Sequence, residues 1–301
     1  MKCKVCSSDN VIRYGFNRLK NSKKQKYLCK DCGLIYSNPN CLKGFRKSKV
    51  FVGQMIDLHN LGISFYKLSH RFHVSSSTVY NWFMKFPERF GKIIESKIQM
   101  AKFSSARHID ETELPIRKKK IWNPEHKRYE MVDQKIHLWA MEDNVTKFVN
   151  CFYVSPLKDS ESCTIFLSQS INHPRPGFII TDDAFAFRQP IEIVLNSGEK
   201  NWKKPKVKHI PITKSDPRFK EYKGVNNLIE RLFQTAKSRT KVTRRYRKIE
   251  SIRKLMFMFL LHYNFLKFHR TIRKTPADQA GIGLGKRRIG FYDLMLYFGI
   301  T

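Results

Sequence analysis

Between residues 46 and 95, apolar positions recur every three or four residues, the period of helices with one buried face. We therefore expect three helices, the last two joined by a turn of three or four residues. Their expected bounds are Val50–Leu61, Phe65–Phe72 and Thr78–Phe86. Ser64, and either Ser75 or Ser76, stand where a helix N-cap accepts a backbone N–H. The inward positions of the first helix are expected to be Val50, Met55, Leu58 and Leu61.

After residue 104 the pattern changes to short apolar segments typical of strands, interrupted by helical segments. In order, we expect strands at Ser105–Thr112, Lys135–Met141 and Lys147–Tyr153, a helix at Asp159–Ile171, a strand at Gly177–Asp182, a helix, a short strand at Lys208–Thr213, and a helix carrying Glu230. A short turn at Glu142–Asn144 joins the second and third strands, which predicts that the first three strands form an antiparallel meander. This order predicts an α/β fold.

The net charge of the chain limits the kinds of partner that it can bind. Lys and Arg number 58 against 25 Asp and Glu, a net charge of +33. DNA is the polyanion that best offsets such self-repulsion. A membrane fits less well, because the longest apolar run, Leu255–Leu261, is far shorter than the roughly 20 residues of a spanning helix. No apolar signal core follows Met1. We expect a cytoplasmic, nucleoid-associated protein whose partner is double-stranded DNA.

Four of the seven cysteines form two pairs with metal-ligand spacing, Cys3-x-x-Cys6 and Cys29-x-x-Cys32. Two such pairs can supply the four thiolates of a closed, structural zinc site. Short strands predicted between the pairs make this unit a zinc ribbon. Cys41 is an alternative ligand, although a free thiol is the favoured interpretation, and two further cysteines are expected in the core, Cys151 and Cys163.

Three basic or polar stretches are expected to contact DNA. The loop between the cysteine pairs is rich in lysine, and the third helix would enter the major groove as the second helix of a helix-turn-helix unit. A dense basic run follows the helix of Glu230. The predicted DNA-contacting residues are Lys20, Lys23, Lys24, Lys26, Ser77, Thr78, Tyr80, Asn81, Lys85, Lys237, Arg239, Lys241, Arg244 and Arg245. A solvated basic surface, or plain helix packing, is the alternative for each stretch.

Three acidic residues stand on predicted core elements of a chain that is poor in acids. Asp110 lies on the first strand, Asp182 ends an apolar strand, and Glu230 projects beside the buried stripe of its helix. Three carboxylates can hold two divalent ions about 3.5–4 Å apart for phosphodiester chemistry. Such hard oxygen ligands favour Mg²⁺. Taken singly, each acid is more often a cap or a turn former.

These acids and their neighbours resemble the catalytic blocks of the DDE transposases of prokaryotic insertion sequences, which belong to the retroviral-integrase superfamily. The blocks are Asp110–Thr112, Thr181–Phe187 and Asn226–Arg231, within a similarity that spans about Ser104 to Ala280. The resemblance implies a ribonuclease-H-like mixed sheet flanked by helices. It implies that Asp110, Asp182 and Glu230 hold two Mg²⁺ or Mn²⁺ ions, and that a homodimer or larger assembly holds transposon ends and target DNA.

Two departures from the family pattern matter. The second acid is doubled, so Asp183 is an alternative to Asp182, although the spacing to Ala184 favours Asp182. The distance from Asp182 to Glu230 is long, and the excess lies in a polar insertion, Ser197–Lys208. The remaining acids considered are expected at the surface: Asp133, Asp143, Glu113 and Glu221. His108 and His137 are expected to be ordinary strand residues.

The sequence therefore predicts a zinc ribbon over residues 1–41, a helix-turn-helix domain over 46–95, a catalytic domain over 104–280 and a C-terminal tail over 281–301. The favoured function is a transposase that binds transposon ends, cuts a phosphodiester bond and joins the freed 3′-hydroxyl to target DNA. A non-catalytic DNA-binding regulator or domesticated relative is the second hypothesis. A ribonuclease-H-like nuclease without strand transfer is the third.

Overall fold

The computed structural model describes residues 2–300 except 4–5, 7, 20–21, 37–41, 43–44, 46, 117, 133–134, 172, 183–184, 197–206, 213–216, 218–228, 240–247 and 287–288. The chain divides into two compact units, Met1–Leu58 with Ile289–Thr301, and His59–Arg288. The grouping of residues 289–301 with the N-terminal unit was not predicted. The insertion at Ser197–Lys208 lies almost entirely outside the described residues, as do Asp183 and Cys41.

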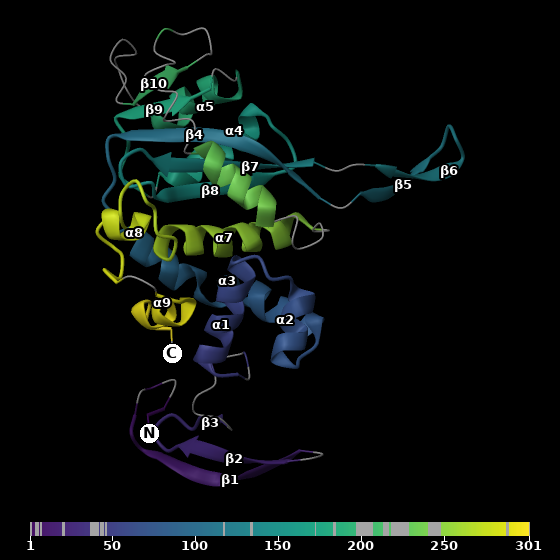
Figure 1. Ribbon diagram of the computed structural model, residues 1–301, viewed down its shortest axis with the longest axis vertical. Coiled ribbons are helices and arrows are strands. Elements are labelled where there is room, and N and C mark those ends of the chain that lie inside the picture. Colours follow the sequence, from purple (N-terminus) through teal and green to yellow (C-terminus); the bar gives the residue numbers. More distant parts are fainter. Residues whose placement is uncertain are drawn as a thin grey trace. The chain divides into compact units, whose positions relative to one another are not determined.

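The first unit contains a small antiparallel sheet of strands β1 (Val11–Leu19), β2 (Ser22–Cys29) and β3 (Ile35–Tyr36), in the order β1-β2-β3 (Figure 1). It also holds most of helix α1 (Lys49–Asn60) and helix α9 (Phe291–Tyr297). The carboxylate of Asp57 accepts the backbone N–H of Phe291 at 2.9 and 2.8 Å, which joins α9 to α1. This carboxylate thus satisfies an N–H at the start of a helix, where such donors lack partners within the helix.

The inward face of α1 differs from the prediction. Met55 is fully buried and Leu58 is half-buried, but Val50 and Leu61 are exposed. Val52 and Ile56 are buried instead. The reason is the close approach of α9. A Cβ atom at Gly53 would lie 2.9 Å from the backbone nitrogen of Tyr292, so the helix turns its glycine side toward α9. The apolar residues of α1 form two overlapping stripes, and periodicity alone did not show which of the two faces the core.

The second unit begins with the two helices predicted as a helix-turn-helix pair, α2 (Phe65–Phe72) and α3 (Ser76–Ile98). Ser64 caps α2 as predicted, by accepting the N–H of Lys67. Of the two serines expected to cap α3, Ser75 does so, by accepting the N–H of Thr78. The third predicted helix was too short, because α3 continues through Pro87 to Ile98. Its apolar stripe continues with it, at Phe86, Phe90 and Ile94.

A five-stranded mixed sheet forms the centre of the second unit, with the strand order β10-β9-β4-β7-β8 (Figure 1). The strands are β4 (Ala106–Pro115), β7 (Lys135–Asp143), β8 (Val149–Ser155), β9 (Phe178–Thr181) and β10 (Lys208–Pro211). Strands β4, β7 and β8 form the predicted antiparallel meander, while β4, β9 and β10 run parallel. The prediction of a mixed α/β fold is confirmed.

Helices follow the strands in the predicted order. They are α4 (Ser160–Ser170), α5 (Phe185–Leu195), a helical segment over residues 229–239, α7 (Ile249–Phe265) and α8 (Pro276–Gln279). Helix α7 meets the edge strand β8, where the side-chain amide of Asn264 bonds both the N–H and the carbonyl of Val149 at 2.9 Å. It also meets α3, where the hydroxyls of Tyr80 and Ser251 lie 2.8 Å apart. Helix α7 thus packs against β8 and α3, and most of its apolar side chains are buried within the second unit.

One apolar core lies between the sheet and helices α4 and α5. It contains Ile109, Trp139, Met141, Cys151, Cys163, Phe166, Leu167, Ile179, Phe187, Ile191, Leu195 and Val207. Both cysteines expected in the core are there. Because side chains alternate along a strand, Ile109 in this core means that Asp110 points to the opposite face of the sheet.

The prediction that Asp143 lies at the surface is wrong. Its side chain is fully buried, and its carboxylate accepts hydrogen bonds from Ser104 N at 2.6 Å and Thr146 N at 2.8 Å. The hydroxyls of Ser104 and Thr146 also donate to it, each at 2.8 Å. An aspartate in a turn signals a local cap, but the sequence does not show that the distant Ser104 closes over it. Of the other acids expected at the surface, Glu113 is exposed, and Asp133 and Glu221 lie outside the described residues.

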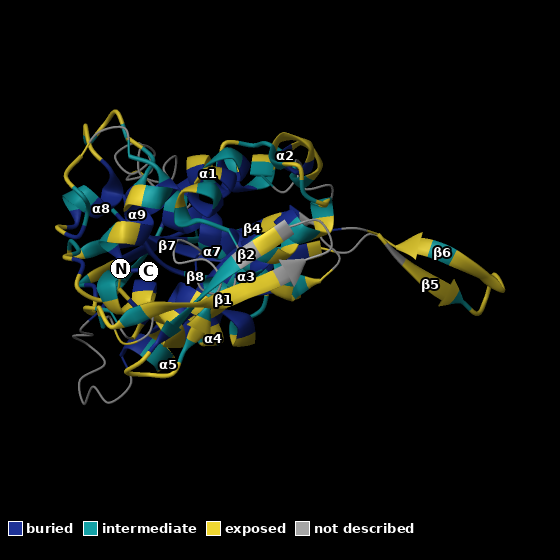
Figure 2. Ribbon diagram, turned by 90° about the horizontal axis from the view of Figure 1, so that it is seen from below, coloured by how far each residue is buried: buried dark blue, intermediate teal, exposed yellow. Residues whose placement is uncertain are grey.

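A second feature was not predicted. Between β4 and β7 the chain forms a separate two-stranded antiparallel sheet, β5 (Lys119–Asn123) and β6 (Arg128–Val132). Both views show this hairpin extending away from the five-stranded sheet (Figures 1 and 2). None of the helices in the described part of the chain combines the length and the apolar character that a membrane span needs.

Candidate functional site

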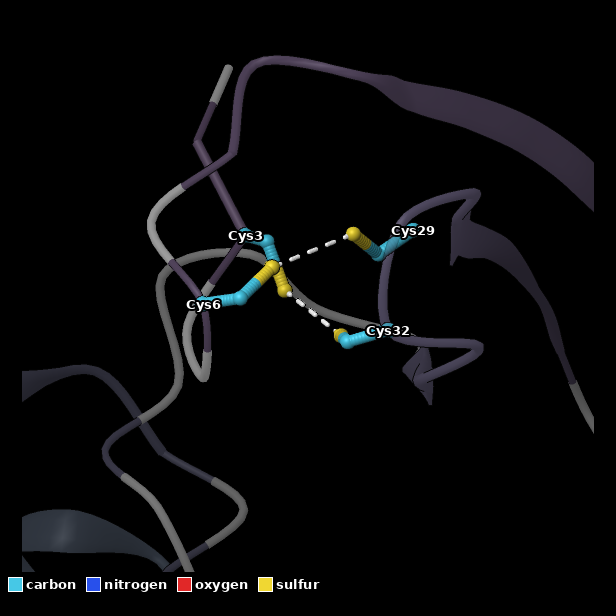
Figure 3. A group of neighbouring side chains, drawn as sticks. All are labelled: Cys3, Cys6, Cys29 and Cys32. Carbon is cyan, nitrogen blue, oxygen red and sulfur yellow. Dashed lines mark hydrogen bonds between the residues drawn. The ribbon is translucent and has the colours of Figure 1, made fainter.

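The four predicted zinc ligands form a compact cluster. The sulfur atoms of Cys3, Cys6, Cys29 and Cys32 all lie within 4.8 Å of one another (Figure 3). The Sγ atoms of Cys3 and Cys32 are 3.5 Å apart, as are those of Cys6 and Cys29. A tetrahedron of sulfurs about 2.3 Å from zinc has edges of about 3.8 Å, so this donor set fits the ion.

Local structure explains why these thiols converge. Strands β1 and β2 pair Val11 with Cys29, which brings the second cysteine pair beside the segment that follows the first. Gly33 adopts φ +69°, a conformation suited to glycine, and its N–H donates to the carbonyl of Cys29 at 2.9 Å. The backbone N–H of Ser8 lowers the pKa of Cys6, but burial and the neighbouring thiols outweigh it and raise that pKa to about 12. A bound cation would remove this mutual opposition to ionisation.

The register of the central sheet brings two of the three predicted catalytic acids together. Strands β4 and β9 run parallel, with Arg107 opposite Ile179 and His108 opposite Ile180. Two positions further along the chain from this pair lie Asp110, on β4, and Asp182, the residue that directly follows the end of β9. Neighbouring strands are about 4.8 Å apart. At the end of β9, the hydroxyl of Thr181 lies 2.8 Å from Nε2 of His209 on β10. The two acids thus come from parallel strands in the middle of the sheet.

The electrostatics of Asp110 fit a cation site. Burial, and next the nearby carboxylate of Asp182, raise the pKa of Asp110 to about 7. The backbone N–H of Glu111 donates to Asp110 Oδ1 at 2.8 Å and partly offsets this rise. A buried carboxyl whose ionisation is opposed by a nearby carboxylate is a suitable donor for a divalent ion, whose charge would favour the ionised form of Asp110.

A lysine beside the two acids was not singled out in the sequence. Lys158 pairs with the carboxylate of Glu111. Although burial lowers the pKa of Lys158, its hydrogen bond with Glu111 and the charges of Glu111, Asp182 and Asp110 raise it. Its side chain is 39% exposed. The cation therefore lies close to both aspartates and still reaches solvent.

Glu111 itself is held on its other side. Nδ1 of His137, on the neighbouring strand β7, donates to Glu111 Oε2 at 3.0 Å, and the Glu111 side chain is only 9% exposed. The expectation that His137 is an ordinary strand residue is therefore incomplete. A lysine directly before the N-cap Asp159 of α4 was the available sequence signal. The closeness of Lys158 to Asp110 depends on how the strands of the sheet pair, so the number of residues between them in the sequence could not predict it.

Glu230 does not join the aspartates in a compact group. It is exposed on the helical segment 229–239, whose predicted inward residues Ile229, Leu232, Phe233 and Ala236 are all buried. Within the described part of the chain, the four cysteines are the one set of three or more Cys, His, Asp or Glu side chains with ligand atoms within 4.8 Å. Asp183 lies outside the described residues.

The predicted DNA-contacting residues have mixed surroundings. On α3, Ser77 and Asn81 are exposed, while Thr78, Tyr80 and Lys85 are half-buried. Tyr80 differs most from the prediction, because its hydroxyl contacts Ser251 and its ring packs edge-on against Phe65, with ring centroids 5.6 Å apart. Lys23 is exposed on β2 and Lys26 is half-buried, as are Lys237 and Arg239 on the helical segment 229–239. Lys20, Lys241, Arg244, Arg245 and the side chain of Lys24 lie outside the described residues.

Comparisons with known proteins give limited similarity. No family model and no curated protein matches the chain. Among solved structures, the catalytic core domain of BIV integrase is similar, with 13% identity and a TM-score of 0.37 over 59% of this chain and 93% of that chain. A simian T-cell lymphotropic virus intasome in complex with PP2A regulatory subunit B56 gamma has 14% identity and a TM-score of 0.40, over 63% of this chain and 57% of that chain. Likeness at this level carries no argument about activity.

Proposed function

We propose that this protein is a DDE-type DNA transposase, which binds the ends of a mobile element and catalyses metal-dependent cleavage and joining of DNA strands. The observation that carries the proposal is the pair of Asp110 and Asp182 on adjacent parallel strands, with burial raising the pKa of Asp110 to about 7. The net charge of +33 supports a polyanionic substrate. The resemblance of the three acidic blocks supports DNA strand transfer in particular.

The proposed roles follow from the position of each group. Asp110 and Asp182 hold divalent metal, Mg²⁺ or Mn²⁺, and Glu230 completes the donor set when DNA and metal are bound. The ions supply activation of the attacking oxygen and stabilisation of the leaving oxygen. Lys158, between the aspartates and solvent, contacts the phosphate of the scissile strand. Glu111 and His137 hold this lysine in place.

The cysteine cluster and helix α3 have separate proposed roles. The four-cysteine cluster binds one structural Zn²⁺, which fixes the ribbon formed by β1, β2 and β3. The exposed Ser77 and Asn81 at the start of α3 contact bases or phosphates of the element's ends, as the second helix of a helix-turn-helix pair does. Two ends must be held together for strand transfer, so a homodimer or larger assembly is proposed.

A joining assay tests the function directly. The full chain, incubated with Mg²⁺, plasmid and a duplex from the ends of the element that encodes it, is expected to insert the duplex 3′-end into the plasmid. Asp110→Asn should lower the rate by on the order of 10³-fold or more, because several kcal/mol of charge stabilisation are lost. Asp133→Asn is a matched control, since the sequence gives this acid no catalytic context. Nicked but never joined plasmid would support a nuclease instead.

A non-catalytic DNA-binding protein is the second candidate. The observation in its favour is the exposed position of Glu230 outside a compact carboxylate group. It predicts DNA binding that is equal for the wild type and for Asp110→Asn, with neither cleavage nor joining at any Mg²⁺ or Mn²⁺ concentration.

A further inference from the structure

The hairpin of β5 and β6, with its connecting turn at residues 124–127, has no assigned role; we call it the arm. Its strands pair only with each other among the strands that the structure describes. Both views show it extending from the sheet, and its surface is almost wholly exposed (Figure 2). A two-stranded hairpin is at best marginally stable in water by itself. A long exposed arm of this kind therefore suggests a partner.

The register divides the arm into two unlike faces. Trp122 pairs with Tyr129 and Lys120 with Met131, so these four side chains share one face, which we call the aromatic face. The opposite face carries the pairs Ile121 with Glu130 and Asn123 with Arg128. The two faces can thus be altered separately, by substitutions at adjacent positions of β5.

The aromatic face is open to solvent. Trp122 is 49% exposed, Tyr129 59% and Met131 54%. The rings of Trp122 and Tyr129 meet edge to face with centroids 5.1 Å apart, and the Lys120 ammonium lies 4.7 Å from the Tyr129 ring centroid. Large apolar side chains gathered on one exposed face mark an interaction site more often than chance exposure does. A lysine beside aromatic rings suits a ligand that carries both negative charge and planar aromatic groups.

The opposite face makes the tip of the arm rigid. Asn123 Oδ1 accepts the N–H groups of Glu125 at 2.9 Å and His126 at 3.2 Å. The carboxylate of Glu130 accepts from Asn123 Nδ2 at 3.1 Å and from Arg128 Nε at 3.2 Å. Nδ1 of His126 lies 2.8 Å from Glu130 Oε1. The turn is therefore pre-formed, which reduces the entropy lost when the arm binds.

Charge identifies the class of partner. The arm contains four Lys or Arg and two Glu, and two further cations, Arg117 and Lys118, directly precede it in the sequence. Of the two acids, Glu130 is already paired. The arm is thus a cationic ribbon that presents aromatic rings. A two-stranded ribbon fits the major groove of B-DNA, and aromatic side chains stack on unpaired bases. We propose that the arm binds DNA, with the aromatic face against bases and the flanking cations against phosphates.

This inference rests on the proposed function for its choice of DNA, and it adds a second DNA-contacting surface to that function. The arm leaves the sheet at Pro115, five residues along β4 from Asp110. At about 3.3 Å per residue this is roughly 16 Å, or on the order of five base pairs at 3.4 Å each. The arm would therefore contact DNA at least that far from the reacting phosphate.

The test uses the full chain and two probes of equal length, a blunt duplex and the same duplex with four unpaired nucleotides at one end. The variant is Trp122→Ala with Tyr129→Ala, and the matched control is Ile121→Ala, an exposed apolar residue on the opposite face of the same strand. The double variant is expected to bind at least one probe about 10- to 100-fold more weakly. Ile121→Ala should bind both probes as the wild type does.

The two probes separate the two modes of contact. A larger loss on the tailed probe indicates stacking on unpaired bases, whereas an equal loss on both indicates contact with the duplex groove. A direct readout comes from fluorescence: DNA should quench the emission of the wild type more than that of Trp122→Phe, which keeps a ring but lacks the reporting indole. The three variants should show the same thermal melting as the wild type, because the altered side chains are exposed.

Two results would overturn the inference. One is equal DNA affinity of the double variant and Ile121→Ala on both probes. The other is a change in oligomeric state of the double variant with unchanged DNA affinity, which would make the partner a second copy of the chain. Joining measured on the same samples keeps the proposals apart. Joining with no dependence on the arm removes only this inference, while arm-dependent binding without cleavage or joining removes only the proposed enzyme activity.

Discussion

The two candidate metal centres differ in how their ligands are brought together. Each cysteine pair is local, and the pairing of β1 with β2 unites the two pairs within one small sheet, so all four sulfurs lie within 4.8 Å. The carboxylates come from two strands and a helix of a larger unit, and only Asp110 and Asp182 are adjacent. A structural centre is thus complete in the folded chain, whereas the proposed catalytic centre still has an exposed third ligand.

Removal of a cysteine ligand is expected to have the largest effect. Cys29→Ser should abolish binding of one zinc per chain and unfold the ribbon, because structural zinc contributes on the order of 10 kcal/mol to small domains. Zinc content and limited proteolysis of residues 1–41 measure this. Cys151→Ala, outside the cluster, should keep the metal. An intact, protease-resistant ribbon in chelator would show that the cluster does not need an ion.

The carboxylate centre should behave in two stages. Without DNA, Mg²⁺ at about a hundredfold excess over its Kd should stabilise the second unit by about 2–3 kcal/mol. Asp110→Asn should abolish this gain, while Glu230→Gln should keep most of it, since Glu230 stands apart from the aspartates. In the joining assay both variants should be inactive. Equal loss of Mg²⁺ stabilisation in the two variants would show that three ligands already act together without DNA.

Lys158 offers a smaller and more specific change. Lys158→Met keeps an unbranched side chain of nearly the same length but removes the charge beside Asp110 and Asp182. Joining activity is expected to fall about 10- to 100-fold, because a hydrogen bond to a charged phosphate, worth about 1.5–3 kcal/mol, is lost. Lys158→Arg should restore part of it. Because Lys158 lowers the pKa of Asp110, the activity profile of the Met variant should shift to higher pH. An unshifted profile would contradict this role.

The smallest predicted effect concerns a buried acid on the same sheet. Burial raises the pKa of Glu142 to about 8, although Lys147 and the hydroxyl of Tyr263, 3.4 Å from Oε1, act against the rise. A carboxyl whose folded pKa is raised stabilises the fold most below its unfolded pKa, near 4.5, and loses this as pH rises toward 8. Glu142→Gln should therefore match the wild type most closely below pH 4.5 and become progressively more stable than the wild type as pH rises toward 8.

Chemical denaturation followed at several pH values measures this difference. Glu113→Gln is the matched control, because Glu113 lies on the neighbouring strand β4, is exposed, and pairs with Lys135 at 3.1 Å. The difference in stability between Glu113→Gln and the wild type should not grow with pH. A Glu142→Gln variant that loses stability as pH rises would mean that the ionised carboxylate, paired with Lys147, is the favoured native form.

The sequence by itself determined the features that depend on local spacing. The cysteine pairs predicted their cluster, Ser64 and Ser75 predicted two helix starts, and alternating apolar segments predicted the meander and the order of helices and strands. These predictions succeed because each depends on residues that lie within a few positions of one another: paired ligands, a cap and its helix, or alternating side chains. The register that brings Asp110 beside Asp182 was expected only through the resemblance of the acidic blocks.

Only the tertiary structure decided the features made by contacts between distant segments. The burial of Asp143 needs Ser104, the face of α1 needs Tyr292, and the position of Lys158 beside Asp110 needs the pairing of β4 with β9. The arm was missed for a different reason. Its residues are strongly charged and its strands lack a buried face. The alternation of Tyr129 and Met131 with Arg128 and Glu130 is short and was not taken as a strand.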